Sequence, residues 1–211
     1  MNRTGSGNAP RSLFRGIYAL VEPERSNPLR FIEALLEGGV RLFQIRAKRG
    51  ITAEVIAALC ARVRTRGGLV IVNDDVTLAA LADGVHLGQE DAAQHDLPAL
   101  RATLGTRIIG LSCGTPAEAR AARTGLIDYI GAGPIFATPS KSDAGAPIGI
   151  SGVRAVVGAT TLPVAAIGGI NLERLGRVRE SGAQMAAILS GLSGAADTAA
   201  NARAYVDAWD R

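Results

Sequence analysis

Three polar side chains stand at alternate positions near the end of an apolar run: Gln44, Arg46 and Lys48. Alternate side chains of an extended strand point to the same side, so all three would face one ligand. If that side is the interior of a barrel, an unpaired Arg and Lys there would be costly, and we expect an anionic partner. In the alternative, Lys48 with Arg49 is an exposed loop charge and Arg46 pairs with an acid of the core.

Carboxylates follow the next two apolar runs, with Asp74 after the first of them and Asp91 after the second. Successive strand ends are neighbours in a barrel, so we expect these two acids side by side. Mg²⁺ prefers carboxylate oxygen and is commonly held by one or two carboxylates together with substrate phosphates, a pattern that a diphosphate would complete. Asp75 and Glu90 stand next to this pair and could replace either member, and acids at strand ends also serve as turn and cap residues.

Glycine-containing turns follow the last two apolar runs. Gly168 and Gly169 end the seventh run, and Ser190 and Gly191 end the eighth. In many barrels this region binds a phosphate through backbone N–H groups and a helix N-terminus. We therefore expect a single phosphate here, although glycine turns can also serve close packing alone.

The longest loop-like segment spans 136–149 and is rich in Thr, Pro, Ser, Lys, Asp and Gly. Loops of this length are often binding elements. Within it, the hydroxyls of Thr138 and Ser140 could orient a ligand, and the ammonium of Lys141 could neutralise departing phosphate oxygens. The alternative is ordinary surface variation.

The histidines and cysteines form no recognisable metal or nucleophile motif in the sequence. His86 lies inside an apparent strand without a second histidine at ligand spacing, so we interpret it as a packed core imidazole. Cys60 and Cys113 lack C-x-x-C spacing and are interpreted as reduced thiols. The sequence indicates neither a Ser-His-Asp nor a Cys-His arrangement.

Short apolar runs alternate with segments of helical period, which is typical of βα units around a parallel sheet. We predict strands at 14–21, 42–46, 69–73, 84–87, 108–112, 128–132, 163–167 and 184–189. Side-chain caps predict helix starts at Asn27, Thr115, Ser151 and Asn171, and a Pro and a Glu after Thr115 complete a capping box. The last helix is expected to place one face inward, formed by Ala195, Ala199, Ala202, Val206 and Trp209.

These patterns predict an α/β protein with a single (β/α)8 TIM barrel and an active site at the C-terminal ends of the strands. An open doubly wound sheet would carry a Gly-rich phosphate turn after its first strand, and residues 19–23 form no such turn. We expect the barrel domain to span 13–211. Residues 1–12 are interpreted as a flexible N-terminal tail, because the segment is polar, contains glycine and lacks the apolar core of a secretory signal.

Composition narrows the class of protein. Of the 211 residues, 47% are hydrophobic and 26 are glycine, which suits a globular core with many tight turns. The net charge of +4 is not gathered in a long basic run with aromatic residues, so we expect no nucleic-acid partner. No apolar stretch approaches the roughly 18 residues of a membrane span, so we expect no membrane partner and a cytoplasmic location. The sequence leaves the oligomeric state open and allows a homo-oligomer.

Five segments in fixed order resemble the thiamine-phosphate synthase family, also called thiamine-phosphate pyrophosphorylase. They are QIRAK at 44–48, VNDD at 72–75, DGVHLGQED at 83–91, DYIGAGPIFATPSK at 128–141 and AIGGI at 166–170. The resemblance implies a barrel transferase that couples 4-amino-2-methyl-5-hydroxymethylpyrimidine diphosphate with thiazole phosphate. Thiamine phosphate and diphosphate would be the products, Mg²⁺ the cofactor, and small-molecule substrates the partners.

Matching the family motifs residue by residue implies roles for individual side chains. The pyrimidine diphosphate would be held by Gln44, Arg46, Lys48, Asn73, Ser112 and Lys141, and Mg²⁺ by Asp74 and Asp91. The thiazole would be contacted by Thr138 and Ser140, with Gly169, Leu189 and Ser190 around its phosphate. Of these, Lys141, Arg46 and Ser112 would be the catalytic residues. In this family the diphosphate is understood to leave before the thiazole nitrogen attacks the resulting pyrimidine carbocation, which agrees with a site of cations and a metal.

Two places depart from the family pattern. Ser140 stands where a second threonine is usual, which keeps the hydroxyl and loses a methyl group. Gln184 and Met185 stand where Asp-Gly is frequent, a change that we expect to alter packing more than chemistry. Related thiazole tautomerases share the barrel and the thiazole phosphate site without the full metal and diphosphate set, and they are the alternative function. A noncatalytic phosphate-binding barrel is a more distant alternative.

Overall fold

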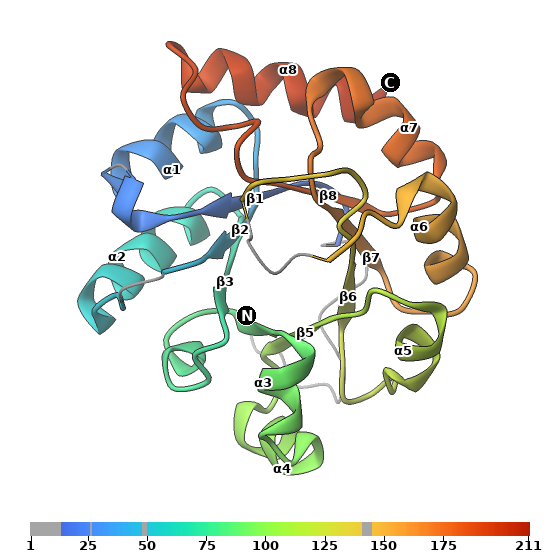
Figure 1. The fold of residues 1–211 in the computed structure, drawn as a ribbon. Coiled ribbons are helices and arrows are strands. Elements are labelled where there is room, and N and C mark those ends of the chain that lie inside the picture. Colours follow the sequence, from blue (N-terminus) through green and yellow to red (C-terminus); the bar gives the residue numbers. More distant parts are fainter. Residues whose placement is uncertain (1–13, 26, 48–49, 141–144) are drawn as a thin grey trace.

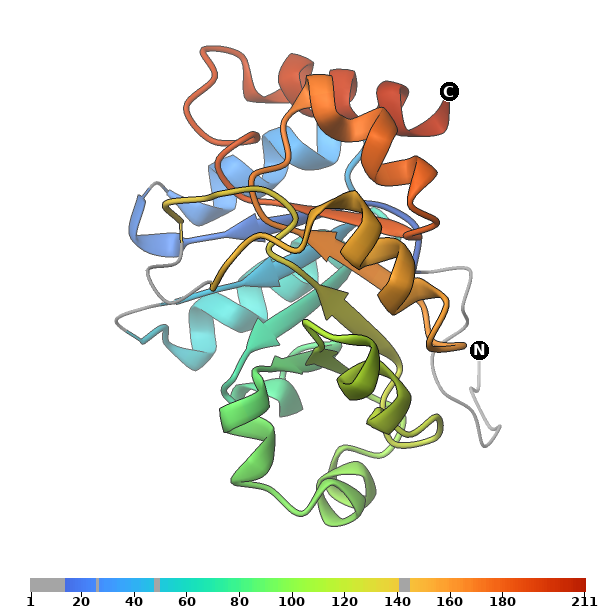
Figure 2. The same ribbon diagram turned by 45° about the vertical axis from the view of Figure 1, so that its right-hand side comes forward.

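The structure is a computed structural model that describes residues 14–25, 27–47, 50–140 and 145–211. Its eight strands are parallel and pair in sequence order, and β8 pairs with β1, so the sheet closes into a barrel. Helices surround the strands on the outside (Figures 1 and 2). The predicted (β/α)8 barrel is confirmed. The tail predicted at 1–12 lies outside the described residues.

The strands begin and end close to the predicted positions. They are β1 (Gly16–Val21), β2 (Leu42–Ile45), β3 (Leu69–Asn73), β4 (Gly84–Leu87), β5 (Ile108–Ser112), β6 (Tyr129–Ala132), β7 (Val164–Ile167) and β8 (Met185–Ile188). Several predicted ranges extend one or two residues beyond the strand, because the sequence does not show where the pairing of a strand begins and ends. Phe14, for example, is buried but precedes β1.

The helices are not distributed one to each connection. They are α1 (Pro28–Glu37), α2 (Ala53–Arg64), α3 (Gln89–Ala93), α4 (Leu97–Leu104), α5 (Pro116–Ala121), α6 (Gly149–Val157), α7 (Leu175–Glu180) and α8 (Thr198–Asp210), with 3-10 turns η2 (Pro23–Arg25), η3 (Leu78–Ala80) and η4 (Leu172–Arg174). The connection between β3 and β4, which is described throughout, contains η3 and no α-helix, whereas α3 and α4 both lie between β4 and β5. The chain therefore passes from β3 to β4 by a short path.

Three of the four predicted helix caps are confirmed. Asn27 caps α1, Thr115 forms the capping box at α5, and Asn171 caps η4. The prediction for Ser151 is wrong, because α6 begins at Gly149 and Ser151 lies inside the helix. Gly149 has a φ of +66°, a left-handed conformation that glycine adopts readily, and the chain enters α6 through this turn without a side-chain cap.

The last helix begins later than its apolar pattern suggests. Asp197 is its N-cap, and the carboxylate accepts the N–H of Ala200 at 2.9 Å. Ala195 therefore precedes the helix, and its predicted place on the inner face is wrong. The buried residues of α8 are Ala202, Tyr205 and Trp209.

Apolar and aromatic side chains fill much of the barrel interior. This cluster is separate from the layer between strands and helices and consists of Phe14, Tyr18, Leu20, Leu42, Ile71, Ile108, Tyr129, Ala165, Met185, Ala187 and Leu189. The ring of Phe14 stacks on that of Tyr129, with centroids 5.4 Å apart. Because Phe14 precedes β1, this packing occupies the N-terminal side of the interior and leaves the C-terminal side for a ligand.

Gln184 has the packing role expected of it. Its Oε1 accepts the N–H of Val164 at 2.8 Å, and its Nε2 donates to the carbonyl of Gly182 at 2.7 Å. Both bonds lie at the N-terminal ends of β7 and β8, while Met185 is fully buried. The departure from the family pattern at these two positions therefore lies at the end of the strands opposite to the predicted site.

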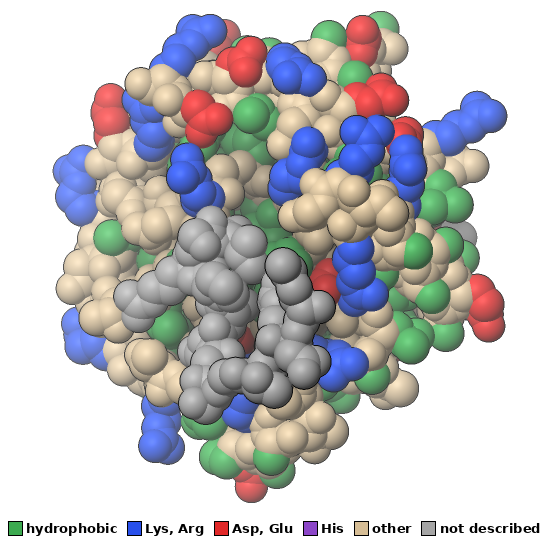
Figure 3. All heavy atoms as spheres, turned by 180° about the vertical axis from the view of Figure 1, so that it is seen from behind, with side chains coloured by type: hydrophobic (Ala, Val, Ile, Leu, Met, Phe, Trp, Pro, Cys, Tyr) green, Lys and Arg blue, Asp and Glu red, His purple; other side chains and the backbone are tan. Residues whose placement is uncertain are grey.

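The face opposite to the view of Figure 1 carries charges of both signs. On its described part, Lys and Arg side chains stand with Asp and Glu among them (Figure 3). No helix among the described residues is long and apolar enough to cross a membrane.

A buried ion pair ties α4 to the start of β6. Nη2 of Arg101 lies 2.5 Å from Oδ2 of Asp128, whose side chain is 1% exposed. The same oxygen accepts the N–H of Ile109 in β5 at 2.8 Å. Burial raises the pKa of the Asp128 carboxyl, and the Ile109 hydrogen bond and the Arg101 charge act in the opposite direction. The pair therefore links one helix to two strands.

Asp128→Ala should lower the free energy of unfolding by about 3 kcal/mol, because it leaves the guanidinium of Arg101 without its carboxylate acceptor. Urea denaturation measures the change. The matched control is Glu33→Ala, which removes an ion pair with Arg62. The Glu33 side chain is 31% exposed and the Arg62 side chain 40%, so this loss should change the free energy of unfolding little. Equal losses in the two variants would contradict the role given to the buried pair.

Candidate functional site

A cavity of about 220 Å³ opens among the ends of the strands. Every strand contributes to its lining, with Tyr18, Gln44, Asn73, His86, Ser112, Gly131, Ala165 and Ala187 coming from β1 to β8 in that order. Residues that follow the strands also line it, among them Arg46 after β2 and Ser190 after β8. The cavity is therefore on the C-terminal side of the barrel, where the site was predicted.

This cavity brings together most of the predicted binding residues. Those in its lining are Gln44, Arg46, Asn73, Ser112, Thr138, Ser140, Gly169, Leu189 and Ser190. Asp74 and Asp91 are not part of the lining, although Asp74 directly follows the lining residue Asn73. Lys48 and Lys141 lie outside the described residues.

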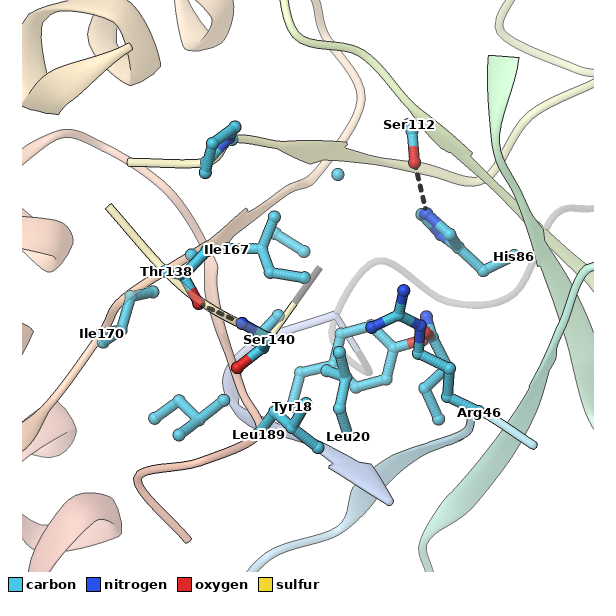
Figure 4. A pocket seen from close by; sticks show the side chains of 18 of the residues that line it. Tyr18, Leu20, Arg46, His86, Ser112, Thr138, Ser140, Ile167, Ile170 and Leu189 are labelled. Carbon is cyan, nitrogen blue, oxygen red and sulfur yellow. Dashed lines mark hydrogen bonds between the residues drawn. The ribbon is translucent and has the colours of Figure 1, made fainter. Parts of the chain in front are cut away.

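The cavity has two chemically different sides. Arg46 projects on one side, near the hydrogen-bonded pair of His86 and Ser112 (Figure 4). Thr138 and Ser140 lie on the other side, where the N–H of Ser140 donates to Oγ1 of Thr138 at 3.2 Å. Aliphatic side chains lie around the space between them, including Leu20, Ile167 and Leu189. One side thus offers a cation, the other offers hydroxyls, and the region between suits an uncharged ring.

The carboxylates of Asp74 and Asp91 lie close together. Partial burial, and then the negative charge of Asp91, raise the pKa of the Asp74 carboxyl, although Asp74 keeps an exposed surface. Oδ1 of Asp74 accepts the N–H of Gly88 at 3.4 Å, and the amide of Asn73 donates to Oδ2. A Cβ at Gly88 would lie 2.7 Å from Oδ2 of Asp91, so glycine leaves room for the second carboxylate.

Two carboxylates make an incomplete ligand set. Within the described part of the chain, no three His, Cys, Asp or Glu side chains gather around one metal position. A divalent cation held by Asp74 and Asp91 would therefore need water or ligand oxygens to complete its coordination, as is usual for Mg²⁺. Asp74 also has a φ of +61°, the one left-handed backbone among the described non-glycine residues, and such strain often accompanies a functional role.

Asp75, the neighbouring candidate, has a structural task. Its Oδ1 accepts the N–H of Thr77 at 2.9 Å and the N–H of Leu78 at 3.0 Å, so it closes the turn that leads into η3. Glu90 is exposed in the first turn of α3. The geometry favours Asp74, which lies beside Asp91, over Asp75 as a ligand of a cation.

The turn after β7 requires glycine for two reasons. Gly168 and Gly169 have φ values of +105° and +61°, and a Cβ at Gly169 would lie 2.7 Å from the carbonyl oxygen of Ala137. The N–H of Phe136 donates to the carbonyl of Gly168 at 3.1 Å. Arg174 fixes the turn further, because it donates to the carbonyl of Gly169 at 2.8 Å and lies 4.6 Å from the centre of the Phe136 ring. The turn and the loop after β6 thus form one packed unit beside the cavity.

His86 has a larger role than the sequence indicated. It is buried, with 9% exposed, as expected for a core imidazole, but it also lines the cavity. Nε2 lies 3.0 Å from Oγ of Ser112, and Nδ1 lies 2.9 Å from the hydroxyl of Tyr129. The strand register pairs His86 with the predicted site residue Asn73, which only the structure reveals. Tyr18, which also lines the cavity, was not predicted either.

Comparisons with known proteins agree over nearly the whole chain. The family model described as thiamine monophosphate synthase matches residues 17–192. A thiamine-phosphate synthase of Moorella thermoacetica is 42% identical over 181 residues, covering 83% of this chain and 85% of that protein. The thiamine biosynthesis bifunctional protein ThiM/ThiE of Symbiobacterium thermophilum is 46% identical over 204 residues, covering 94% of this chain and 42% of that longer protein. A solved thiamine phosphate pyrophosphorylase from Pyrococcus furiosus has a TM-score of 0.85 at 30% identity, covering 94% of this chain and 96% of that one.

The two adjacent acids after β3 should differ in their effect on stability. Asp75→Ala should lower the free energy of unfolding by about 1 kcal/mol, because the turn into η3 loses its side-chain acceptor. Asp74→Asn should not lower it, because the amide removes repulsion from Asp91 and asparagine tolerates the left-handed backbone. Thermal denaturation without added metal measures both. A loss in Asp74→Asn as large as that in Asp75→Ala would assign Asp74 a structural task instead.

Proposed function

The chain belongs to the thiamine monophosphate synthase family and has thiamine-phosphate synthase activity, and we propose that it couples 4-amino-2-methyl-5-hydroxymethylpyrimidine diphosphate with thiazole phosphate by Mg²⁺-assisted loss of diphosphate. One observation carries this proposal: a single cavity adjoins two different regions suited to anions. Arg46 and the paired carboxylates serve one region, and the glycine turn after β7 serves the other. A coupling reaction needs both phosphorylated substrates in one space, with their reacting atoms oriented toward each other.

The region around Arg46 suits the diphosphate. A guanidinium binds phosphate oxygens through two parallel hydrogen bonds, and the amide of Asn73 lines the cavity with it. Asp74 and Asp91 would hold Mg²⁺, whose charge would offset the repulsion between the two carboxylates. Mg²⁺, when bound, would neutralise diphosphate oxygens and so make diphosphate a better leaving group.

The opposite region suits the thiazole phosphate. The turn at Gly169 brings backbone close to the cavity, and Ser190 adds a hydroxyl after β8. Thr138 and Ser140 place two further hydroxyls on this side, and Leu189 gives the ring an apolar contact. A phosphate bound mainly by backbone and hydroxyl groups would need no metal.

The proposed chemistry breaks the bond between the exocyclic carbon of the pyrimidine and the diphosphate oxygen, and the electron pair leaves with diphosphate. The lone pair of the thiazole nitrogen then forms the new carbon–nitrogen bond. Arg46 would stabilise the charge that grows on the leaving group, together with Lys48 and Lys141, which we assign from their positions in the family motifs. Ser112 would contact the pyrimidine from β5.

The thiol nearest to this chemistry is a poor nucleophile. Cys113 lines the cavity, but burial raises the pKa of its thiol to about 12, so it stays protonated at neutral pH. Burial raises the pKa of Cys60 in the same way, to about 11. Neither cysteine is therefore suited to a covalent intermediate, which supports direct coupling of the two substrates.

Incubation of the protein with both substrates and Mg²⁺ tests the proposal. Thiamine phosphate and diphosphate should appear in equal amounts, and omission of either substrate or of Mg²⁺ should stop their formation. Conversion of thiazole phosphate into its tautomer without thiamine phosphate would assign the barrel to tautomerases. Binding of both substrates without any product would assign it to passive binders.

Asp74→Asn and Asp91→Asn should each lower turnover by about a hundredfold or more, because each removes a charged ligand of a cation worth several kcal/mol to the transition state. Steady-state kinetics at increasing Mg²⁺ should show partial recovery. Asp75→Asn is the matched control, because asparagine keeps the turn and its activity should stay near that of the wild type. Full activity in both Asp74→Asn and Asp91→Asn would place the metal elsewhere.

Gly169→Ala should weaken thiazole phosphate binding by about tenfold or more, because a methyl group meets the Ala137 carbonyl and the left-handed backbone becomes strained. Isothermal titration calorimetry measures the affinity. Gly176→Ala is the control, because a Cβ there has nothing within 4 Å. Unchanged affinity in Gly169→Ala would show that the monophosphate binds away from this turn.

A further inference from the structure

A continuous chain of hydrogen bonds crosses the barrel interior beside the cavity. Nε2 of Gln44 donates to the hydroxyl of Tyr18 at 3.0 Å, and that hydroxyl lies 2.7 Å from the hydroxyl of Tyr129. Tyr129 lies 2.9 Å from Nδ1 of His86, and Nε2 of His86 lies 3.0 Å from Oγ of Ser112. Gln44 and Ser112, the two ends, come from β2 and β5, which are not neighbours in the sheet. Both ends line the cavity, and Figure 4 shows the last bond.

Two glycines in the strands provide the space for this chain. A Cβ at Gly110 in β5 would lie 2.5 Å from the hydroxyl oxygen of Tyr129. A Cβ at Gly131 in β6 would lie 3.1 Å from Cε1 of His86. Neither glycine has a positive φ, so their backbone conformation does not require glycine. The missing side chains make room for the phenol and the imidazole.

The chain has a direction because each hydroxyl carries one hydrogen. Tyr18 accepts from the amide nitrogen of Gln44, so its own hydrogen goes to Tyr129, since no third partner for this hydroxyl is found among the described residues. Tyr129 then donates to Nδ1 of His86. A neutral imidazole that accepts at Nδ1 carries its hydrogen on Nε2, which donates to Ser112. Burial raises the pKa of both phenols, so they remain protonated donors at neutral pH.

We propose that Tyr18, Tyr129 and His86 form a positioning relay that fixes the hydrogen-bonding direction of Gln44 and Ser112 together. At one end, the Gln44 amide nitrogen donates a hydrogen bond to Tyr18, and its carbonyl Oε1 is left to accept from the ligand. At the other end, the Ser112 hydroxyl accepts from the relay and keeps its hydrogen for the ligand. Reversing one bond would reverse the others, because each hydroxyl has one hydrogen to give.

The relay has a consequence for the ligand and for Ser112, and this part rests on the proposed function. A ligand must place a donor against Gln44 and an acceptor against Ser112, and an aminopyrimidine carries both kinds of group. Ser112 also receives a hydrogen bond from Nε2 of His86, so the imidazole is not placed as a base toward it. The Ser112–His86 pair therefore presents a donor to the ligand and does not create a serine nucleophile.

Nitrogen-15 NMR of labelled histidine tests the direction of the relay without any substrate. The chain has two histidines, so in a His95→Gln variant every histidine signal comes from His86. At neutral pH, Nε2 of His86 should be the protonated nitrogen. Tyr129→Phe removes the donor to Nδ1 and should increase the tautomer protonated there, whereas Tyr205→Phe, which removes a buried hydroxyl outside the relay, should leave the His86 signals unchanged. Protonation of Nδ1 in the wild type, or an unchanged tautomer in Tyr129→Phe, would overturn the proposal.

Kinetics test whether the relay acts on one substrate. Tyr18→Phe and Tyr129→Phe keep the rings and remove one hydrogen-bonding group each, so the KM for pyrimidine diphosphate should rise about tenfold. The KM for thiazole phosphate should stay the same, because its region lies on the other side of the cavity. A general loss of packing would instead raise both values, and that result would overturn the positioning role.

A double-mutant cycle tests whether Tyr129 acts through Ser112. In a Ser112→Ala background, the relay can act only through Gln44, so adding Tyr129→Phe should change kcat/KM less than it does in the wild type. Independent effects that multiply would overturn the coupling. If the wild type makes no thiamine phosphate, the proposed function fails, and the NMR measurement still decides the direction of the relay.

Discussion

Closure of the sheet between β8 and β1 is the constraint on which the site depends. In a closed barrel every interior side chain is surrounded by others, so it must be apolar or hydrogen-bonded. Tyr18 and Tyr129 satisfy this rule with each other, although they are 111 residues apart in the sequence. The same closure brings at least one lining residue from each of the eight strands to a single cavity.

The separation of the two regions proposed to bind anions follows from which strand each kind of polar group follows. Cationic and acidic groups follow β2, β3 and β4, whereas glycine turns and hydroxyls follow β6, β7 and β8. Aliphatic side chains lie between them, so each charged group of a ligand has a separate place. In the proposed reaction, this arrangement would keep the two phosphorylated substrates from competing for one region and would hold their uncharged rings together.

The sequence predicted the barrel and most of the cavity because both depend on local patterns. Apolar runs locate strands, and polar residues at their ends are brought together by any closed parallel barrel. Tyr18 and Tyr129 were not predicted because an aromatic residue inside an apolar run has the pattern of a core residue, and its partner is known only after closure. The choice between Asp74 and Asp75 likewise required the backbone, since only hydrogen bonds show that Asp75 is engaged in a turn. Ser151 was a wrong cap because a glycine turn, which no side-chain pattern reveals, set the start of α6.

Calorimetric titration of each substrate with and without Mg²⁺ tests the central claim, that one cavity binds two phosphorylated molecules by different means. The affinity for pyrimidine diphosphate should fall strongly when a chelator removes Mg²⁺, because in this proposal Asp74 and Asp91 would hold Mg²⁺, and its charge would neutralise diphosphate oxygens. The affinity for thiazole phosphate should stay the same, because backbone and hydroxyl groups would bind its phosphate without a metal. An equal dependence of both affinities on Mg²⁺, or no dependence of either, would contradict this account.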